Sequence, residues 1–477
     1  MERTSTTQLA VIGSGPGGYA AAFRAADLGL SVTLIGQEPA PGGICLHVGC
    51  IPSKALLHVA RVLAEAREAE RWGITFAAPR LDLERLRAWK RSVVERLTGG
   101  LRLLAEQRGV RYLRGRAHLL DARTLLVETD SGDAERVSFQ QAILATGSRP
   151  AELPGLSLSS PRIMDSTRAL ELEDVPRTLL VVGGGYIGLE LGTVYAMLGA
   201  RVTLVEMLPG ILPGVDRDLV SILARRIESL FEAVLVNTVV ADVREEAEGL
   251  RVRLEGVGGH AVPPPVERVF EKVLVCVGRK PNAQGLGLER TRVERDARGF
   301  VRVDAQRRTA EPTLFAIGDV AGEPMLAHKA MHEARVAVEA ILGHPTAFAP
   351  RAIPAVVFTD PEIAWCGLTE TQAREENRPI KVARFPWAAS GRAVTLDRPE
   401  GVTKLILDPE SERILGVGLV GVGAGELIAE GVLAVEMGAR ASDLERVIHP
   451  HPTLSETLME AAEAFLGMSP HLYRRKA

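Results

Sequence analysis

The chain has 477 residues, of which 46% are hydrophobic and 25% are charged, and its formal net charge is −3. This length predicts roughly three or four domains, and the composition is that of an ordinary globular chain. No basic run argues for nucleic acid or for an anionic membrane, no apolar stretch reaches about 18 residues free of charge or glycine, and the N-terminus lacks a signal-peptide core. We therefore expect neither nucleic acid nor membrane as a partner, and only four cysteines favour a reducing cytoplasm.

The first predicted elements are a short buried strand at residues 9–12, a glycine-rich turn and an alanine-rich helix. The turn reads Gly13-Ser14-Gly15-Pro16-Gly17-Gly18. In this context glycines let the backbone approach a dinucleotide pyrophosphate at the helix N-terminus, although a lone motif of this kind is weak support. The next strand should end in an acid for the ribose hydroxyls, but that place holds Gly36. Either Glu38 reaches back or the ribose is held in another way.

Residues 42–54 contain two cysteines, Cys45 and Cys50, at the start of a long helical pattern. A helix start favours a thiolate. In a regular helix, Cα atoms five residues apart are about 8.7 Å apart, whereas a disulfide tolerates about 7 Å at most. The turn must therefore be distorted for the two to bond, and Gly49 and Pro52 allow this. A bridge that closes so short a loop adds little stability, so a bonded pair would be a redox centre; the alternative is two helix cysteines that never bond.

Two helices are predicted between residues 55 and 110, joined near residues 73–80. Strands follow at about 110–113, 125–128 and 142–145. The last strand leads into the tight turn Ala145-Thr146-Gly147-Ser148-Arg149-Pro150, which by itself indicates a turn and little more.

A second nucleotide unit begins at residue 178. A strand leads into Gly183-Gly184-Gly185-Tyr186-Ile187-Gly188, then a helix that carries Glu190, and then a strand that ends at Glu206. A carboxylate at that place accepts from both ribose hydroxyls and repels a 2′-phosphate, so it predicts NAD rather than NADP. Two such units in one chain are much harder to explain as chance glycine turns than one. Residues 256–265 are predicted as a hairpin loop, and the strand at 273–277 closes the unit.

The C-terminal part begins with a strand at 314–317 that ends in Gly318-Asp319, which alone would be a β-turn. From about residue 351 the pattern is β-rich (355–358, 404–407 and 414–420) and then helical (425–437). The chain then reads His449-Pro450-His451-Pro452-Thr453-Leu454-Ser455-Glu456. Thr453 and Glu456 have the spacing of a capping box.

The string GGxCxxxGCxPSK at residues 42–54 resembles the redox-disulfide motif of flavin-linked disulfide reductases, and residues 449–456 resemble their histidine–glutamate pair. From residue 8 to about 467 the chain resembles the dihydrolipoyl dehydrogenases. Glutathione reductases fit less well because they are NADP-linked and typically lack Ser53-Lys54 in this form, and mercuric reductases carry C-terminal cysteines, none of which follows Cys366 here. Ile44 and His47 replace the commonest threonine and asparagine of the motif.

This resemblance implies an α/β fold of the glutathione-reductase type, with two Rossmann-like dinucleotide-binding domains, a central domain and a C-terminal α+β dimerisation domain. The implied domains are an FAD-binding domain with the redox disulfide (1–150), an NAD-binding domain (151–282), a central domain that completes the FAD site (283–350) and an interface domain (351–477).

The resemblance also implies an activity, in which dihydrolipoamide is reoxidised and electrons pass through a Cys45–Cys50 disulfide and FAD to NAD. Cys45 would be the interchange thiol and Cys50 the charge-transfer thiolate. His451, polarised by Glu456, would accept the substrate's proton across a dimer interface, and Lys54 paired with Glu190 would tune the flavin edge. The implied FAD-binding residues are Gly13, Gly15, Pro16, Gly17, Gly18, Glu38, Gly43, Lys54, Ala117, Thr146, Gly147, Ser148, Gly318, Asp319, Met325, Leu326, Ala327 and His328. The implied NAD-binding residues are Gly183, Gly185, Tyr186, Ile187, Gly188, Glu190, Glu206, Val240 and Gly278.

The implied partners are a second copy of the chain, in a homodimer, and the lipoyl-bearing acyltransferase of a 2-oxo-acid dehydrogenase complex. The stretch 319–328 resembles branched-chain members, but the sequence leaves the complex open. The rival hypothesis is a non-catalytic flavoprotein that senses redox state or serves as a docking platform. Retention of His451 and Glu456 speaks against it, because a sensor needs no proton acceptor for a dithiol. Cys276 and Cys366 receive no function.

Overall fold

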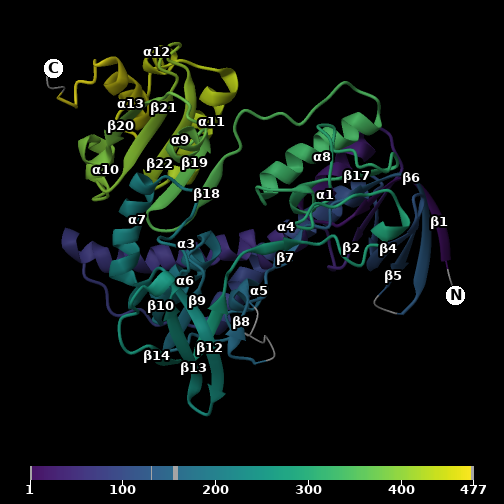
Figure 1. Cartoon of the computed structure of the whole chain (residues 1–477), viewed down its shortest axis with the longest axis horizontal. Helices are drawn as coiled ribbons and strands as arrows, with labels where there is room; N and C mark the ends of the chain where they lie inside the picture. Colours follow the sequence, from purple (N-terminus) through teal and green to yellow (C-terminus); the bar gives the residue numbers. More distant parts are fainter. Residues whose placement is uncertain (1–2, 130–131, 154–159, 474–477) are drawn as a thin grey trace.

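The computed structural model describes residues 3–129, 132–153 and 160–473. Figure 1 shows three lobes: one with β1 and α8 on the right, one with β8 to β15 below, and one with β18 to β22 at the upper left. The N-terminal and C-terminal ends lie at opposite sides of the molecule.

The first sheet has the strand order β3-β2-β1-β6-β5-β4, and β17 pairs with β6. Strands β1, β2, β3, β6 and β17 are parallel to their neighbours in this part, and β4 and β5 are antiparallel. The bounds are β1 (Arg3–Ile12), β2 (Val32–Gly36), β3 (Arg111–Arg114), β4 (Arg116–Asp121), β5 (Thr124–Glu128), β6 (Ala134–Leu144) and β17 (Leu314–Ala316). Every residue of β2 is buried, as expected for a parallel strand covered on both faces.

Two helices from distant parts of the sequence, α1 (Pro16–Asp27) and α8 (Ala327–Ile341), pack together against this sheet. Their contact is rich in alanine, including Ala21, Ala25, Ala334 and Ala337, all fully buried. Small side chains let the two helices approach closely. The glycine turn before α1 and the Gly318-Asp319 turn before α8 are thereby brought to the same end of the sheet.

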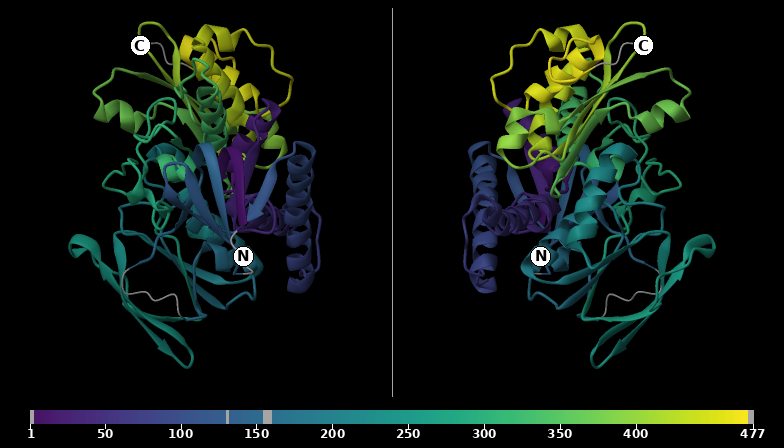
Figure 2. Two further views of the ribbon diagram at one scale, coloured as in Figure 1. Left: turned by 90° about the vertical axis from the view of Figure 1, so that its right-hand side faces the viewer. Right: turned by 90° about the vertical axis from the view of Figure 1, so that its left-hand side faces the viewer.

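The helices that follow the first nucleotide turn form a long hairpin along one side of the molecule (Figure 2). They are α2 (Gly43–Val48), α3 (Cys50–Glu68), the 3-10 helix η1 (Ala69–Trp72) and α4 (Leu83–Gln107). The run Gly43–Trp72 is long and apolar enough, by length and composition, to cross a membrane. Its buried side, with Leu56, Ala60 and Leu63, belongs to a core shared with α6 (Tyr186–Leu198). The apolar composition is thus used in the protein's own core.

The second sheet is parallel, with the order β11-β10-β9-β15-β8. Its strands are β8 (Ile163–Met164), β9 (Thr178–Val182), β10 (Arg201–Val205), β11 (Ala233–Leu235) and β15 (Lys272–Val275), with helices α5 (Ser166–Glu171), α6 and α7 (Arg217–Leu230). An antiparallel sheet of β12 (Thr238–Glu246), β13 (Gly249–Gly256) and β14 (Glu267–Phe270) extends from it. The short pair β7 (Ser148–Pro150) and β16 (Arg279–Pro281) lies where the chain leaves and re-enters the first lobe.

The third sheet is antiparallel, with the order β18-β19-β22-β21-β20. Its strands are β18 (Ala355–Val357), β19 (Glu362–Gly367), β20 (Lys381–Pro386), β21 (Val402–Leu407) and β22 (Ile414–Gly421). The helices are α9 (Glu370–Glu375), α10 (Gly391–Thr395), α11 (Ala424–Met437), α12 (Ala441–Glu445) and α13 (Glu456–Leu466).

A buried lysine joins this third lobe to the second. Lys404 of β21 is fully buried, and its ammonium lies 2.6 Å from Asp216, 2.7 Å from Asp218 and 3.0 Å from Glu370. The two aspartates lie at the start of α7, so the charge cluster fixes the third lobe against the nucleotide unit. Arg384 also pairs with Asp218 and Glu370, so two cations share the three carboxylates.

Most predicted elements lie near their expected positions, including the hairpin loop between β13 and β14. No strand was predicted at the positions of β4, β7, β8, β11, β12, β16, β19 or β20, and β6 begins at Ala134, well before residue 142. Residues 283–350 do not form a sheet of their own among the described residues: β17 pairs with β6 of the first sheet. The proposed domain boundaries stay predictions.

Candidate functional site

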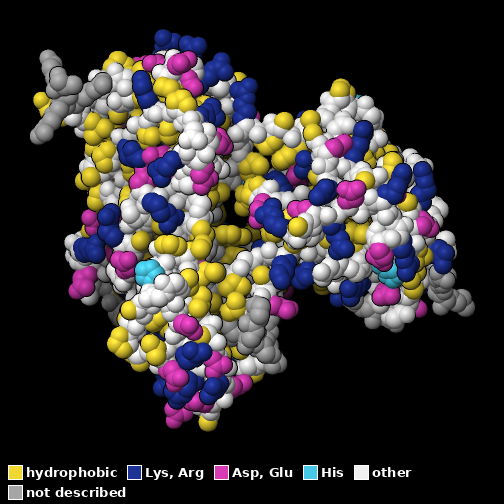
Figure 3. All heavy atoms as spheres, in the orientation of Figure 1, with side chains coloured by type: hydrophobic (Ala, Val, Ile, Leu, Met, Phe, Trp, Pro, Cys, Tyr) yellow, Lys and Arg dark blue, Asp and Glu magenta, His cyan; other side chains and the backbone are white. Residues whose placement is uncertain are grey.

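A cavity of about 660 Å³ lies where the first sheet, α1, α3, α6 and α8 meet. Figure 3 shows the surface hollowed between the lobes, with apolar side chains gathered around the hollow. The residues implied by the resemblance that line this cavity come from segments spread between Gly13 and Ala327. They are Gly13, Gly15, Pro16, Gly17, Glu38, Gly43, Cys45, Cys50, Lys54, Ala117, Thr146, Gly147, Ser148, Tyr186, Ile187, Glu190, Gly318, Asp319, Met325 and Ala327.

The N-terminus of α1 opens into this cavity without a capping side chain. Its N-cap is Gly15, which makes no side-chain hydrogen bond, and Pro16 is the first helical residue. The backbone N–H groups of the first turn are therefore available to an anion such as a pyrophosphate. Gly43 packs directly on this turn at φ +57°, and a Cβ atom there would lie only 2.4 Å from the Cα of Gly15. The cradle therefore requires glycine at position 43, whereas a Cβ atom at Gly15 would lie 4.0 Å from its nearest neighbour, the Cα of Gly43.

The absence of an acid at position 36, where Gly36 stands, has a structural reason. A Cβ atom at Gly36 would lie 2.2 Å from Ser14 Oγ and 2.6 Å from the Tyr112 hydroxyl, so no acid fits there without displacing both. Ser14 Oγ donates to Glu38 Oε2 (3.2 Å), and the Tyr112 hydroxyl donates to the Glu38 carbonyl (2.8 Å). Glu38 is thus held beside the glycine turn, which favours the alternative in which it reaches back to the ribose.

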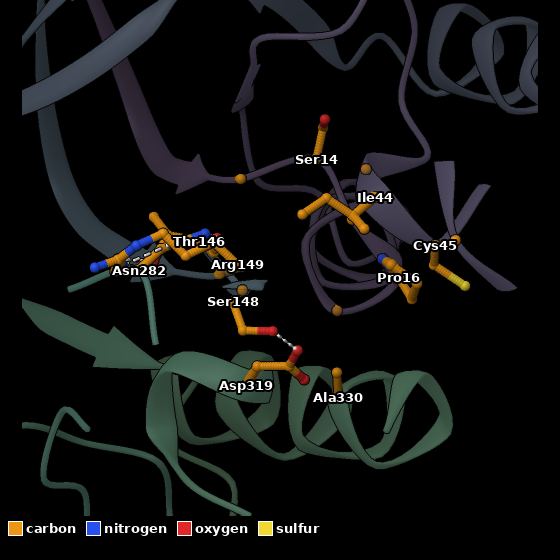
Figure 4. Close-up of a pocket in the computed structure, with 18 of the residues that line it drawn as sticks. Ser14, Pro16, Ile44, Cys45, Thr146, Ser148, Arg149, Asn282, Asp319 and Ala330 are labelled. Atoms are coloured by element: carbon orange, nitrogen blue, oxygen red, sulfur yellow. Dashed lines mark hydrogen bonds between the residues drawn. The ribbon is translucent and has the colours of Figure 1, made fainter. Parts of the chain in front are cut away.

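The opposite wall carries a chain of polar contacts (Figure 4). Ser148 Oγ donates to Asp319 Oδ2 over 2.5 Å, and Arg279 Nε donates to Ser148 Oγ over 2.7 Å. Thr146 Oγ1 donates to the Asn282 carbonyl (2.7 Å), and Asn282 Nδ2 donates back to the Thr146 carbonyl (3.0 Å). Sequence reasoning missed Arg279 and Asn282. Their position directly after the strand at 273–277, at the carboxyl end of a parallel sheet, was the available signal.

The distortion predicted between the two cysteines lies at Gly49. Helix α2 ends at Val48, Gly49 adopts φ −141° and ψ −112°, and Cys50 is the first residue of α3. A Cβ atom at Gly49 would lie 2.8 Å from the Ile44 carbonyl oxygen, so the break depends on glycine. Both cysteines are thiols in this structure and line the cavity. The break removes the regular helical spacing that would keep the sulfurs apart.

The two thiols differ in acidity. The pKa of Cys50 is lowered to about 7, because the hydrogen bond with the Cys45 thiol and the charge of the Lys54 ammonium together outweigh the opposite effect of burial. The same hydrogen bond and burial raise the pKa of Cys45. Cys50 is therefore the sulfur that carries negative charge at neutral pH, and Cys45 keeps its proton.

Lys54 and Glu190 meet at the base of the cavity. Lys54 Nζ lies 2.8 Å from Glu190 Oε2, and Glu190 is 3% exposed. The second oxygen, Glu190 Oε1, accepts from the Phe358 N–H over 3.0 Å, and Lys54 Nζ lies 4.5 Å from the centre of the Phe358 ring. A buried charge of this kind is retained only when it is paired and hydrogen-bonded. Nothing in the sequence indicated Phe358.

The second nucleotide turn has the same construction as the first. Helix α6 begins at Tyr186 after an uncapped Gly185. The acid at the end of β10 lies at this turn: Glu206 Oε2 accepts from the Gly184 N–H (2.7 Å) and Oε1 from the Leu208 N–H (2.8 Å). The uncapped helix and the adjacent carboxylate fit a dinucleotide with free ribose hydroxyls.

Several implied residues lie outside the lining of the main cavity. Gly18 supports the first turn, since a Cβ atom there would lie 1.8 Å from the Gly13 carbonyl oxygen. His328 is directed to the Pro354 carbonyl, 2.7 Å from its Nε2, and Leu326 precedes α8 as its N-cap residue. Val240 belongs to β12 and packs against the core of the second lobe. Gly183, Gly188 and Gly278 also lie outside it, around the second turn.

His451 and Glu456 form a pair at the start of α13. His451 Nδ1 lies 2.9 Å from Glu456 Oε1, and Glu456 Oε2 accepts from the Thr453 N–H over 2.7 Å. Partial burial acts to raise the pKa of Glu456, but the hydrogen bonds from Thr453 and His451 hold that pKa below its usual range. The Glu456 carboxylate thus orients the His451 imidazole and also caps the start of α13. The His451 side chain is 75% exposed and does not line the cavity of its own protomer.

Comparison with known sequences identifies the family. The sequence model of the pyridine nucleotide-disulphide oxidoreductases matches residues 7–334, and the dimerisation-domain model of the same proteins matches residues 353–462. The chain belongs to the pyridine nucleotide-disulphide oxidoreductase family. FAD and NAD, the cofactors that the sequence predicts, are those of this family, and the matched dimerisation domain supports the expected homodimer.

Relatives of known name match the chain over its whole length. Dihydrolipoyl dehydrogenase of Vibrio parahaemolyticus is 46% identical over 100% of this chain and 99% of its own. That of Thermus scotoductus is 47% identical over 98% of this chain and 100% of its own.

Solved structures of this family are also similar. LpdA from Mycobacterium tuberculosis has a TM-score of 0.88 at 26% identity, covering 96% of this chain and 99% of its own. The Cu(II) complex of the HOCl-induced flavoprotein disulfide reductase RclA from Escherichia coli has a TM-score of 0.85 at 27% identity, covering 97% of this chain and 99% of its own. The glutathione-reductase-like α/β fold implied by the sequence is thereby confirmed.

Proposed function

We propose that this oxidoreductase is a dihydrolipoyl dehydrogenase, which oxidises dihydrolipoamide to lipoamide and reduces NAD. The observation that carries the proposal is the cysteine pair: Cys45 and Cys50 flank a glycine break, line the cavity and differ in acidity in the sense that dithiol exchange requires. Full-length relatives of that name, at 46% to 47% identity, support the same substrate.

The proposed exchange passes the substrate's electron pair to the two cysteines. One substrate thiolate attacks Cys45 Sγ, the Cys45–Cys50 bond breaks, and Cys50 leaves as a thiolate. The second substrate sulfur then closes the substrate disulfide and releases Cys45, which takes one proton. The other proton is held at Nε2 of His451, whose Nδ1 is fixed by Glu456. The electron pair now resides on the cysteines, and bound FAD supplies the redox chemistry that links it to NAD.

The residues of the two glycine turns would hold the cofactors. The uncapped N-terminus of α1, with Gly13, Gly15 and Gly43, fits the FAD pyrophosphate. Asp319 and Ser148 fit the hydroxyl groups of the FAD ribitol. The Gly183–Gly188 turn with Glu206 would hold NAD, and the carboxylate would disfavour a 2′-phosphate. The Lys54–Glu190 pair at the base of the cavity would lie at the edge of the flavin ring and tune its redox chemistry.

The exposed His451 supports a site completed across a homodimer, in which the partner subunit's His451 accepts the substrate proton. The protein would serve a lipoyl-bearing acyltransferase in a 2-oxo-acid dehydrogenase complex, of the branched-chain type by the resemblance at 319–328, in the cytoplasm.

The experiment that tests the proposal compares substrates on the FAD-loaded dimer. We expect turnover with dihydrolipoamide and NAD, and little with NADPH and glutathione disulfide. Hg²⁺ and Cu²⁺ belong in the same series, because RclA, a protein of similar fold, forms a complex with Cu(II). A higher kcat/KM with glutathione disulfide or with a metal ion than with lipoamide would reject the proposal.

Mixed dimers test the shared site directly. In a heterodimer of His451→Gln and Cys50→Ser protomers, one site receives both lesions and the other receives neither. We expect activity above that of either parent. Heterodimers that form but recover no activity would exclude a site completed by the partner subunit.

A further inference from the structure

A second cavity, of about 350 Å³, lies behind the Lys54–Glu190 pair. Its walls come from α3, α6, α7, the segment 358–362 and the start of α11. Lys54 lines both this cavity and the main one. The lysine therefore separates the two spaces, with its ammonium fixed by Glu190 at 2.8 Å.

The second cavity leads from the surface toward Lys54. His58, Arg61 and Glu426, at one part of its lining, are exposed, whereas Thr193 is 4% exposed. The hydroxyl of Thr193 has no hydrogen-bond partner among the described residues. A buried hydroxyl without a partner is unfavourable, and a cavity of this size can hold water beside such a group.

A carboxyl group in the wall can exchange protons with such water. Glu362 lines the cavity, and its Oε2 accepts from the Gly425 N–H over 2.8 Å. Burial raises the pKa of this carboxyl, and the positive charge of Arg61 opposes that effect only in part. Glu362 is therefore more easily protonated than an exposed glutamate.

The cations of the cavity are already paired, which argues against an anionic ligand. Arg226 lies 2.6 Å from Glu68 and 3.3 Å from Asp360. Arg61 lies 2.8 Å from Glu65. With Lys54 on Glu190, no arginine or lysine of the described lining is left to bind a phosphate or carboxylate. The second cavity is therefore better suited to water and to proton transfer than to an anionic ligand.

The proposed reaction requires a proton at this side of the main cavity. A hydride consists of a proton and an electron pair. Cys50 delivers the electron pair as a thiolate, without a proton, and the substrate's protons are held at Cys45 and at the partner subunit's His451. Each hydride that leaves on NADH takes one proton, which either comes from Cys45, as its thiol re-enters the disulfide, or is delivered from solvent through Lys54.

We propose that the second cavity is a hydrated route by which Lys54 exchanges protons with solvent, with Thr193 and Glu362 as its positioning residues. Lys54 Nζ gives a proton toward the main cavity and takes one from a water molecule held near Thr193. That water is reprotonated from solvent past Glu362, so the lysine ends each cycle with its charge restored. The inference rests on the proposed function, because it assigns a path to the proton of that hydride.

The test uses Thr193→Val, which keeps the shape of the side chain and removes its hydroxyl, and Thr193→Ser, which keeps the hydroxyl. Glu362→Gln is the second variant, since its amide oxygen can still accept from Gly425. All three are prepared as FAD-loaded dimers. Melting temperatures establish that each variant folds.

The main readout is isotopic. Each enzyme transfers hydrogen from NADH deuterated at the reacting position to the acetylpyridine analogue of NAD, and mass spectrometry measures the deuterium kept in the product. An open proton route washes deuterium out into solvent. We expect deuterium retention to rise several-fold in Thr193→Val and in Glu362→Gln, and to remain near that of the parent in Thr193→Ser.

A crystal structure supplies the second readout: we expect an ordered water bonded to Thr193 Oγ1 in the parent and its loss in Thr193→Val. Unchanged retention in both Thr193→Val and Glu362→Gln, or a dry cavity in the parent, would overturn the inference. The isotope exchange needs no dithiol. Failure of dihydrolipoamide turnover with altered retention would therefore reject the proposed function and leave the proton route standing.

Discussion

Replacing Glu456 by Gln separates the role of this residue in a catalytic pair from its role at the start of a helix. The carboxylate accepts two hydrogen bonds, one from His451 and one from the Thr453 N–H. Glutamine has one acceptor oxygen, so one of these bonds must be lost. A hydrogen bond to a charged group contributes about 1.5–3 kcal/mol, and the 19% exposure of the carboxylate favours the lower end.

If glutamine keeps the Thr453 bond, the imidazole loses its fixed orientation and the helix start survives. A loss of about 1.4 kcal/mol corresponds to about tenfold. We therefore expect Glu456→Gln to turn over dihydrolipoamide about tenfold more slowly, with a melting temperature close to that of the parent. His451→Gln should lose about 10²–10⁴-fold, the usual effect of removing a general base. Because the His451 side chain is 75% exposed, its replacement should leave folding intact.

The assay measures steady-state turnover, FAD content, melting temperature and the reduction of FAD by NADH for each variant. His449→Gln is the matched control: its side chain is 4% exposed and lies 2.8 Å from Glu430, so its replacement should lower stability and spare turnover. A nearly silent Glu456→Gln together with an active His451→Gln would refute the reasoning. Glu456 would then be a capping residue alone.

Four further substitutions have definite outcomes. Lys54→Met should raise the pKa of Cys50 from about 7. The long-wavelength thiolate band of the reduced enzyme forms only above that pKa, so it should appear at higher pH in this variant. Cys50→Ser should abolish the band, and a band that persists in Cys50→Ser would contradict the assignment of the thiolate to Cys50. Glu206→Ala should weaken NAD binding and narrow its preference over NADP by about 1.5–3 kcal/mol at most, and an unchanged preference would remove the ribose argument. Gly36→Ala should lower the FAD content of the purified protein because its Cβ would lie 2.2 Å from Ser14 Oγ, whereas full FAD content would show that the turn tolerates the methyl group.

The sequence predicted those parts of the site in which the residue type itself carries the chemistry. The cysteine pair, the glycine turns and the acid at Glu206 have spacings that few other structures require. The break at Gly49 followed from a distance argument, since a regular helix holds the two Cα atoms too far apart. Local geometry was thus accessible from the chain alone.

Contacts between distant segments were not accessible in this way. Phe358 contributes its backbone N–H to Glu190, and a backbone group leaves no trace in composition. In the sequence, Lys404 is an ordinary residue of a predicted strand. In the structure its ammonium is buried among three carboxylates. Thr193 lies in an apolar helix, and its free hydroxyl has meaning only because a cavity lies beside it.

The pairing of β17 with β6 also governs the order in which the molecule can be built. During synthesis the ribosome releases β6 long before β17, and the whole second sheet, β8 to β15, emerges between them. The nascent chain can therefore complete the inserted nucleotide unit while the host unit still lacks its last strand and α8. The Gly318-Asp319 side of the flavin cavity exists only after about two thirds of the chain has left the ribosome. With FAD in the proposed place, the flavin can bind only after the inserted nucleotide unit has been synthesised.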